Sequence, residues 1–344
     1  MEKRYIITGA AGHVGSTILR LLQDSGHEVY GLLLPGEKPA QDVRNVHYVY
    51  GNVREPDTLA PLFRGAEDRE KIVIHTAAII SIAQGISPQM YSVNVNGTKN
   101  MIRISREQRV SRFVYVSSVH AIPELPHGQT IREVRSFSPD TVVGGYAKTK
   151  AIAAQAVLDA AADGFPAVIV HPSGIIGPYD SGRNHLLQMV TSYMDGKLPA
   201  CVKGGYDFVD VRDVAAGCLL AAEKGQTGAC YILSGQYCSI RNLIAGVGQC
   251  CGKKPLPALP VPLARLAAPI IEFVAKCRGK RPLYTRYSLH TVTSNSNFSH
   301  EKAERELGYC PRATEETIRD MTGWLLNSRE SGLYFQDERR AVLC

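Results

Sequence analysis

Short apolar runs alternate with amphipathic stretches along the first two-thirds of the chain. Runs of this length predict the strands of a parallel sheet buried on both faces, and the amphipathic stretches predict covering helices. The predicted strands span residues 5–8, 28–33, 47–50, 72–75, 112–117 and 167–171, and a later strand, 229–233, is expected to return to the same sheet. The clearest helical patterns span 14–25, 93–108 and 146–162. The pattern therefore predicts an α/β fold with a doubly wound parallel sheet.

The pattern changes after Pro172, where prolines and glycines become dense and strand signals become fewer. We expect a first domain of residues 1–173, to which residues 206–233 return. A smaller, mostly helical lobe is expected to comprise residues 174–205 and 234–330, with a final helix near 315–327. The tail, 331–344, carries only weak signals.

The composition is that of a globular protein. Hydrophobic residues make up 44% of the chain and charged residues 21%, which suits a sizeable core and excludes a disordered protein. The net charge of +7 is modest, and we interpret the densest basic run, 276–281 (KCRGKR), as a solvated loop, with an anion or membrane-surface contact as the alternative. No basic run carries interleaved aromatic residues, so no nucleic-acid partner is expected.

Cysteine usage and the lack of targeting signals predict a cytoplasmic protein. None of the nine cysteines has paired metal-ligand spacing, and Cys250 and Cys251 are adjacent, so we expect reduced thiols and no metal site. No signal peptide precedes the first predicted strand. The most apolar stretch, 256–275, is interrupted by prolines, Arg265 and Glu272, and it is not expected to span a bilayer.

Three glycines, Gly9, Gly12 and Gly15, directly follow the first predicted strand and lead into a helix. Gly9 allows a sharp turn, Gly12 lets backbone amides approach a pyrophosphate, and Gly15 lets the helix pack closely on the strand. The helix N-terminus then offers unpaired N–H groups and a partial positive charge. A plain tight loop is the alternative, but the position between strand and helix favours dinucleotide binding.

Tyr146 and Lys150 lie four residues apart at the start of a predicted helix, so they share one face. A free tyrosine has a pKa of about 10, and a nearby ammonium lowers that pKa by favouring the phenolate. Ser118 ends an apolar strand, at the edge where open α/β sheets bind ligands, and its hydroxyl is suited to a carbonyl oxygen. Taken singly, a surface tyrosine and lysine, or a serine that caps a turn, explain the same residues.

Together these segments resemble the extended short-chain dehydrogenase/reductase family over nearly the whole chain. Residues 8–15 match its TGxxGxxG loop and residues 146–150 its YxxxK pair. Further matches are 51–53 (GNV), 75–78 (HTAA), 94–98 (NVNGT), 171–174 (HPSG) and 207–213 (DFVDVRD). The resemblance implies a Rossmann-type sheet that binds a nicotinamide dinucleotide.

The resemblance also implies roles for individual residues. Tyr146 is expected to be the acid/base, Lys150 to bind the nicotinamide ribose and lower the tyrosine pKa, and Ser118 to orient the substrate oxygen. The expected cofactor-binding residues are Thr8, Gly9, Gly12, His13, Val14, Gly15, Leu34, Lys38, Asn52, Val53, Ala77, Ala78, Asn94, Tyr146, Lys150, His171, Pro172 and Ser173. Two depart from the family pattern, because Asn52 replaces a usual Asp and His171 a usual Arg.

The end of the second predicted strand bears on the choice between NAD(H) and NADP(H). NAD-preferring members usually carry an acidic residue there for the ribose 2′-hydroxyl, and no carboxylate stands near Leu33. Leu34 occupies the position where similar reductases often carry an Arg for the 2′-phosphate. Lys38 is a candidate to replace that Arg, with a solvated loop lysine as the alternative. The sequence favours NADP(H), with NAD(H) as the alternative.

Three functions are compatible with the resemblance: a reductase similar to dihydroflavonol reductases and 3β-hydroxysteroid dehydrogenases, a nucleotide-sugar epimerase or dehydratase, and a non-catalytic NADP-binding regulator. The intact Tyr–Lys pair disfavours the regulator. Val119 and His120 stand where a dehydratase is expected to carry Asp-Glu, and Tyr206 stands where an epimerase usually carries an Arg for the diphosphate. The sequence favours the reductase, acting on a ketone or aldehyde or on the matching secondary alcohol.

Three residues are expected to reach the small-molecule substrate: His120, two residues after Ser118, and Tyr179 and Asp180, which follow a Gly-Pro turn. For His120 a turn histidine is the alternative. The apolar segment 256–274 suits a lipophilic ketone if it covers the pocket, and a plain core of the lobe is the alternative. Family members often dimerise through helices that resemble 93–108 and 146–162, so a homodimer is compatible with the resemblance.

Overall fold

The core of the molecule is a seven-stranded parallel sheet. The computed structural model describes residues 2–40, 42–81, 84–180, 184–264, 266 and 286–330. The strands of the sheet are β1 (Lys3–Thr8), β2 (Glu28–Leu33), β3 (His47–Tyr50), β4 (Glu70–His75), β5 (Arg112–Val116), β6 (Ala167–Pro172) and β10 (Cys230–Leu233). They pair in the order β10-β6-β5-β4-β1-β2-β3. All seven predicted strands are confirmed, with their ends within two residues of those expected.

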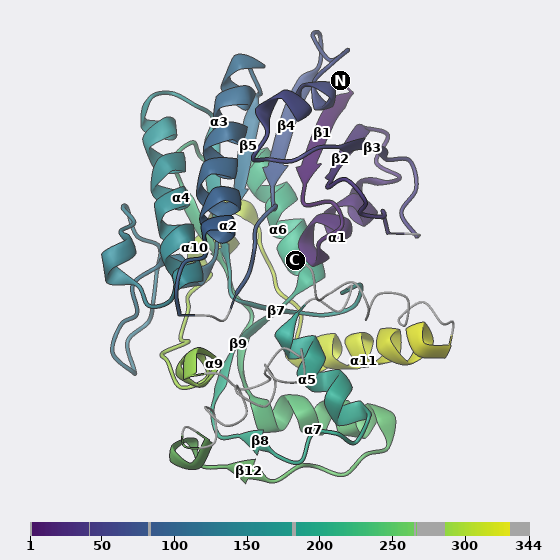
Figure 1. Ribbon diagram of the computed structural model, residues 1–344, viewed down its shortest axis with the longest axis vertical. Helices are drawn as coiled ribbons and strands as arrows, with labels where there is room; N and C mark the ends of the chain where they lie inside the picture. The colour runs from purple at the N-terminus through teal and green to yellow at the C-terminus, as the bar shows by residue number, and fades with distance from the viewer. Residues whose placement is uncertain are drawn as a thin grey trace.

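Helices cover both faces of this sheet (Figure 1). α1 (His13–Leu22) and α6 (Val211–Lys224) lie on one face, and α3 (Thr98–Glu107) and α4 (Gly145–Ala162) lie on the other. Successive strand residues point to opposite faces, so Ile6 packs toward α3 and α4 whereas Ile7 packs toward α1 and α6, both fully buried. Burial on both faces explains why the strands are continuous apolar runs, and it confirms the doubly wound, Rossmann-type fold.

The smaller, largely helical lobe contains more strand than the pattern predicted. β7 (Gly174–Ile176), β9 (Gly205–Asp210) and β11 (Gln236–Ser239) form one sheet, and β8 (Cys201–Val202) and β12 (Ala258–Leu259) form another. The lobe helices are α5 (His185–Met194), α7 (Ile240–Cys251), α9 (Arg286–Thr291) and α11 (Thr314–Glu330). In Figure 1 they lie below the large sheet. The sequence pattern does not reveal these strands because they are two to six residues long and lie beside glycines or prolines, which weaken an apolar pattern.

One helix departs from its expected place. The sequence pattern places α10 (Glu301–Leu307) in the lobe, but the helix packs on α6 and on the edge strand β10. Its Ala303 and Leu307 are fully buried in the apolar layer between α6 and the sheet. The Nζ of Lys302 donates to the carbonyl oxygen of Cys230, 3.0 Å away on β10. The chain therefore returns to the large sheet once more before α11.

The remaining predictions concern membrane-spanning helices, the cysteines, and the basic, apolar and C-terminal segments. In the part of the chain that the structure describes, no helix is long and apolar enough to cross a membrane. The described cysteines are free thiols. The basic run 276–281, most of the apolar stretch 256–275 beyond residue 264, and the tail 331–344 lie outside the described residues.

Candidate active site

The predicted cofactor residues come from the C-terminal ends of neighbouring strands and from the helices beside them. Residues 8–15 run from the last residue of β1 into the first turn of α1, and residues 171–173 form the end of β6 and the residue after it. Leu34 and Lys38 follow β2, Asn52 and Val53 follow β3, and Ala77 and Ala78 follow β4. The structure thus brings them together along one edge of the sheet. In open α/β sheets, this edge is where ligands bind.

The turn after β1 is shaped for the close approach of a pyrophosphate. Gly9 has a left-handed φ of +69°, and a Cβ there would lie 2.9 Å from the backbone nitrogen of Ala77. A Cβ on Gly15 would overlap the carbonyl oxygen of Gly9. The N-terminus of α1, at Gly12, has no side-chain cap among the described residues, and its first turn holds no acidic residue. Its amide groups are therefore available to an anion, so the cradle fits a dinucleotide.

Buried hydrogen bonds hold the segment after β4 against this turn. The Thr8 hydroxyl pairs with His75 Nδ1 at 2.7 Å and accepts from the backbone nitrogen of Ala77 at 3.2 Å. Burial lowers the pKa of His75 to about 3, so its imidazole is neutral. The Asn94 side chain lies in a π-helical segment, Ser92–Gly97, and bonds both backbone groups of Ile79, at 2.8 and 3.0 Å. Thr8 and Asn94 therefore position the backbone around Ala77 and Ala78.

Beyond the ends of β2 and β3, the side chains of Glu37 and Asn52 bind groups within their own turns. The Asn52 amide donates to Glu55 and accepts from the backbone nitrogen of Arg54, so both ends of the amide bind the chain itself. Beyond β2 the Leu34 side chain is 45% exposed and Lys38 is exposed. The backbone nitrogen of Leu34 donates to Glu37 Oε2 at 3.0 Å, so the carboxylate of a residue four positions beyond β2 lies beside the first residue after the strand.

Tyr146 and Lys150 enter the site from the first turns of α4. Both are buried, at 8% and 3% exposure. Lys150 Nζ donates to the carbonyl oxygen of Val116 at 2.7 Å, and it lies 4.9 Å from the ring centre of Tyr115. Burial lowers the pKa of Lys150 to about 7, which brings its titration into the neutral range.

Ser118 is fixed at the end of β5 by two neighbours. Its Oγ accepts from the backbone nitrogen of His120 at 3.2 Å, and its carbonyl oxygen accepts from His171 Nδ1 at 3.0 Å. A carbonyl oxygen only accepts, so the Nδ1 of His171 carries the proton. Burial lowers the pKa of His171 to about 4 and keeps the ring neutral. His171, whose role the sequence left open, therefore ties the ends of β5 and β6 together at Ser118.

An aromatic group adjoins Tyr146. The His120 ring meets the Tyr146 ring edge-on at 6.4 Å and stacks on Tyr206 at 5.7 Å. The Tyr206 hydroxyl pairs with His120 Nε2 at 3.3 Å, and burial lowers the pKa of His120 to about 4. Phe208 and Phe298 pack edge-on against Tyr206 at 6.2 and 6.0 Å. Of these residues, the sequence predicted only His120 to reach the substrate. Tyr206 and Phe208 of β9, and Phe298 before α10, come close to Tyr146 only through the tertiary fold.

Tyr179 and Asp180, expected near the substrate, contact other elements. The Tyr179 ring lies between Arg20 of α1, 4.3 Å away, and Trp324 of α11, 6.3 Å away. Asp180 is buried, with a carboxylate oxygen 3.8 Å from His13 Nδ1. Positive φ angles at Gly177 and Tyr179 turn this segment toward α1. A substrate contact for either residue stays a prediction.

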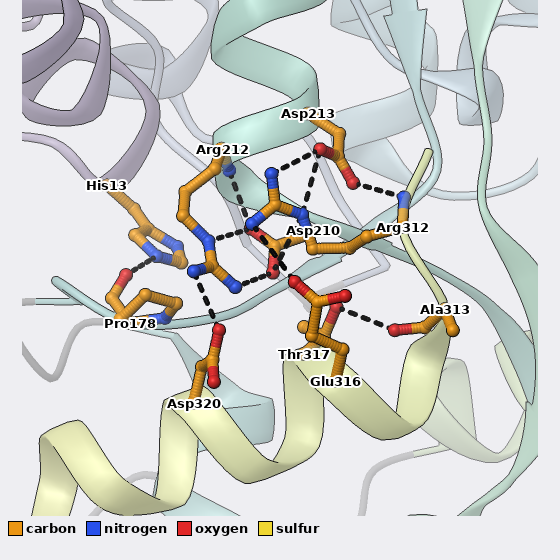
Figure 2. Close-up of polar contacts among 10 residues, drawn as sticks. All are labelled: His13, Pro178, Asp210, Arg212, Asp213, Arg312, Ala313, Glu316, Thr317 and Asp320. Atoms are coloured by element: carbon orange, nitrogen blue, oxygen red, sulfur yellow. Dashed lines mark hydrogen bonds and ion pairs between the residues drawn. The ribbon is translucent and has the colours of Figure 1, made fainter. Parts of the chain in front are cut away.

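The 207–213 block forms an ionic network that joins the lobe to the large sheet (Figure 2). Asp210 and Asp320 both bind Arg212 at 2.7 Å, and Asp213 binds Arg312 at 2.8 Å. These pairs hold α11 against the start of α6. His13, drawn beside them, pairs through Nε2 with the carbonyl oxygen of Pro178 at 2.8 Å, a second link between α1 and the lobe.

Asp207 lies at the start of this block, within the β7–β9–β11 sheet. Its carboxylate accepts from the Ser173 hydroxyl at 2.5 Å and from the backbone nitrogen of Gly235 at 2.9 Å. Burial raises the pKa of Asp207 to about 6. Ser173 is thus bound to a lobe strand at the end of β6.

Comparison with known proteins agrees with this geometry. Residues 5–233 match the model of the NAD dependent epimerase/dehydratase family. The chain belongs to this family. The family member named sterol demethylase protein B, of Methylococcus capsulatus, is 30% identical over 95% of this chain and 99% of its own. A putative dihydroflavonol 4-reductase of Synechocystis sp. is 29% identical over 95% and 96%. The crystal structure of gox2253 superposes with a TM-score of 0.79 at 33% identity, covering 96% of this chain and 99% of the other.

These matches confirm that this epimerase/dehydratase-family member is an enzyme of the extended short-chain dehydrogenase/reductase type. Its class is that of the NAD-dependent oxidoreductases. The similarity extends over both the large sheet and the lobe, since each relative is matched along nearly its full length.

Proposed function

We propose that this enzyme reduces a lipophilic ketone or aldehyde, or oxidises the matching secondary alcohol. The observation that carries the proposal is the aromatic group beside Tyr146, made of His120, Tyr206, Phe208 and Phe298. These side chains offer apolar faces and few hydrogen-bond groups, which suits an apolar substrate. The names of two relatives, a sterol demethylase protein and a dihydroflavonol 4-reductase, point to substrates of that character.

Catalysis rests on groups that move a proton while the bound nicotinamide supplies or accepts a hydride. The Tyr146 hydroxyl gives a proton to the substrate oxygen during reduction and takes it back during oxidation. The Lys150 ammonium favours negative charge on that phenolic oxygen. The Ser118 hydroxyl donates to the substrate oxygen, and its backbone is held for this purpose by His171. NAD(H) and NADP(H) both satisfy this chemistry, because they differ only at the adenosine ribose.

The two other functions have less support. A nucleotide-sugar epimerase needs a cation for the diphosphate, and Tyr206, at the position of the usual Arg, is stacked on a neutral His120. A non-catalytic regulator has no need for a buried Tyr146 and Lys150 side by side on α4. Neither alternative explains the aromatic group.

The test begins with titration of the apo protein with NADH and NADPH, and the fluorescence of the cofactor reports binding. Steroid and flavonoid ketones, then small polar ketones and sugar nucleotides, are added to the complex. We expect oxidation of the bound cofactor by the lipophilic ketones alone. A cofactor that does not exchange and is not consumed by any carbonyl, while a sugar nucleotide is isomerised, would show that the enzyme is an epimerase.

We further propose that a second copy of the chain pairs along α3 and α4, which lie side by side (Figure 1). A groove of about 470 Å³ runs between them, lined by Ile102, Arg106, Ala156 and Ala160 among others. Light scattering on the purified protein should give the mass of a dimer, and Ala156→Arg should give a monomer. A wild-type monomer would refute the pairing.

A further inference from the structure

A serine just beyond the end of β6 is held through both its backbone and its side chain. Ser173 stands between β6 and β7 and is 8% exposed. Its backbone nitrogen donates to the carbonyl oxygen of Leu233, on β10, at 3.2 Å. Its hydroxyl donates to Oδ1 of Asp207, on β9, at 2.5 Å. Two neighbouring strands therefore fix the position of Ser173 and the direction of its O–H bond.

The carboxylate that receives this proton is itself fixed. Asp207 is 4% exposed, and its Oδ1 also accepts from the backbone nitrogen of Gly235 at 2.9 Å. Gly235 approaches β9 so closely that a Cβ there would overlap the carbonyl oxygen of Phe208. The carboxylate is thus held between β9 and the segment that joins β10 to β11.

The pair determines which kind of hydrogen bond the Ser173 hydroxyl can offer to a third group. A carboxylate has no hydrogen to give, so the serine is the donor, and 2.5 Å is a typical length for such a charge-assisted bond. Burial raises the pKa of Asp207 only to about 6, so the group is ionised at pH 8. With its proton used in this way, Ser173 Oγ has only lone pairs left and acts as an acceptor.

Ser173 lies on the side of the sheet where the proposed function places the nicotinamide. The phosphate loop follows β1. In the strand order, β2 and β3 lie on one side of β1 and lead to the expected adenosine residues, whereas β5 and β6 lie on the other and lead to Ser118 and Ser173. The nicotinamide carries a carboxamide, whose NH2 donates and whose oxygen accepts. An acceptor at Ser173 suits the NH2.

We propose that Asp207 is a positioning residue that holds the Ser173 hydroxyl as an acceptor for the carboxamide NH2 of the nicotinamide. The side chains of Tyr206 and Phe208 pack on each other and lie on the face of β9 opposite Asp207. One strand thereby contributes to the aromatic group with one face and orients Ser173 with the other. This inference rests on the proposed nicotinamide chemistry.

The experiment compares two dinucleotides that differ only in the group that Ser173 is proposed to bind. Calorimetric titration at pH 8, without a carbonyl substrate, gives dissociation constants for NAD+ or NADP+, whichever binds more tightly, and for its 3-acetylpyridine analogue. In the analogue a methyl group replaces the carboxamide NH2. A general loosening of the fold weakens both dinucleotides alike, so the ratio of the two constants reports this contact alone.

Three variants and a matched control are measured in the same way. Ser173→Ala removes the hydroxyl. Asp207→Leu frees the serine proton, and Asp207→Ala serves in its place if the larger side chain prevents folding. Asp207→Asn keeps an oxygen that accepts from Ser173. Ser234→Ala is the control, because Ser234 is a buried serine just beyond β10 whose hydroxyl pairs with His300. Thermal unfolding checks that each variant folds.

We expect the wild type to bind the natural dinucleotide roughly 3- to 10-fold more tightly than the analogue, the effect of one hydrogen bond. Ser173→Ala and Asp207→Leu should both lower this ratio to less than about 2, whereas Asp207→Asn and Ser234→Ala should retain it. A wild-type ratio near 1, or a ratio that survives Ser173→Ala or Asp207→Leu, would overturn the inference. Failure of both natural dinucleotides to bind would instead overturn the proposed function, and the inference with it.

Discussion

The cofactor side and the substrate side of this site are assembled differently. Gly9, Gly12 and Gly15 lie within one strand–turn–helix unit, so their spacing alone sets their geometry. On the substrate side, His120 follows β5, Tyr206 comes from β9 and Phe298 precedes α10. A site made of consecutive residues can be identified from a sequence, whereas a pocket whose walls come from distant segments emerges only from the tertiary fold.

The largest effect on binding should come from a substitution on the cofactor side of the site, in the glycine turn after β1. Gly9→Ala introduces a Cβ against the backbone of Ala77 and should raise the dissociation constant for cofactor roughly 100-fold or more. Gly26→Ala is the matched control, because Gly26 has a similar φ of +73° and open space around its Cβ position. Both variants should lose roughly 1–2 kcal/mol of stability from backbone strain. Equal cofactor affinity in the two variants would contradict the assignment of the turn after β1 as the pyrophosphate-binding loop.

Acid should destabilise the apo protein through histidines from both sides of the site. The pKa values of His75, His120 and His171 are lowered to about 3, 4 and 4 by burial. In the unfolded chain these histidines have a pKa of about 6.5 and bind protons below that pH, whereas in the folded chain they stay neutral. The free energy of unfolding therefore falls as the pH drops from 6.5 toward 4. Asp207 changes the stability in the opposite direction. Because its pKa is raised to about 6 in the folded state, the folded chain binds a proton there below that pH and gains stability.

The net loss by pH 4.5 should be on the order of 3–5 kcal/mol. Denaturant midpoints between pH 7 and 4.5 measure it. The variant His120→Asn, which removes one of the three imidazoles, should show a shallower slope. A midpoint that stays constant over this range would mean that the histidines are protonated in the folded protein.

A smaller effect is expected where the two sides meet, at His171. Leu in its place removes the hydrogen bond to the carbonyl of Ser118 and should lower kcat roughly 10-fold. Asn presents a side-chain N–H close to the position of Nδ1, so His171→Asn should retain most of the activity. Cofactor dissociation constants and unfolding midpoints should separate this positioning effect from a loss of fold. Equal kcat values in the two variants would remove the positioning role.

The smallest effect should come from Tyr206→Phe. This change removes the hydroxyl that pairs with His120 Nε2 but keeps the aromatic ring. We expect KM for the ketone to rise roughly 3-fold, with kcat and cofactor affinity unchanged, because the substrate meets mainly the ring faces. Tyr237→Phe, on an exposed tyrosine, is the control. A large fall in kcat would instead place Tyr206 among the catalytic residues.

The same contrast explains what the sequence could and could not predict. The seven strands of the large sheet are apolar runs buried on both faces, and the pattern located each of them. The five short lobe strands, the packing of α10 on the sheet, and the contacts of Tyr179 with Arg20 and Trp324 depend on pairing between distant segments. Glu37 belongs to the same class, because a turn carries its carboxylate back to a strand that had already ended.

The central claim is that Tyr146 supports hydride exchange with a lipophilic carbonyl compound. The most direct test incubates the protein with NADH or NADPH deuterated at C4 of the nicotinamide and a steroid or flavonoid ketone, then measures the mass of the alcohol formed. We predict one deuterium per alcohol with the wild type, and a rate roughly 10²–10⁴-fold lower with Tyr146→Phe at unchanged cofactor affinity. Unlabelled alcohol from the wild type, or full-rate transfer by Tyr146→Phe, would contradict the claim.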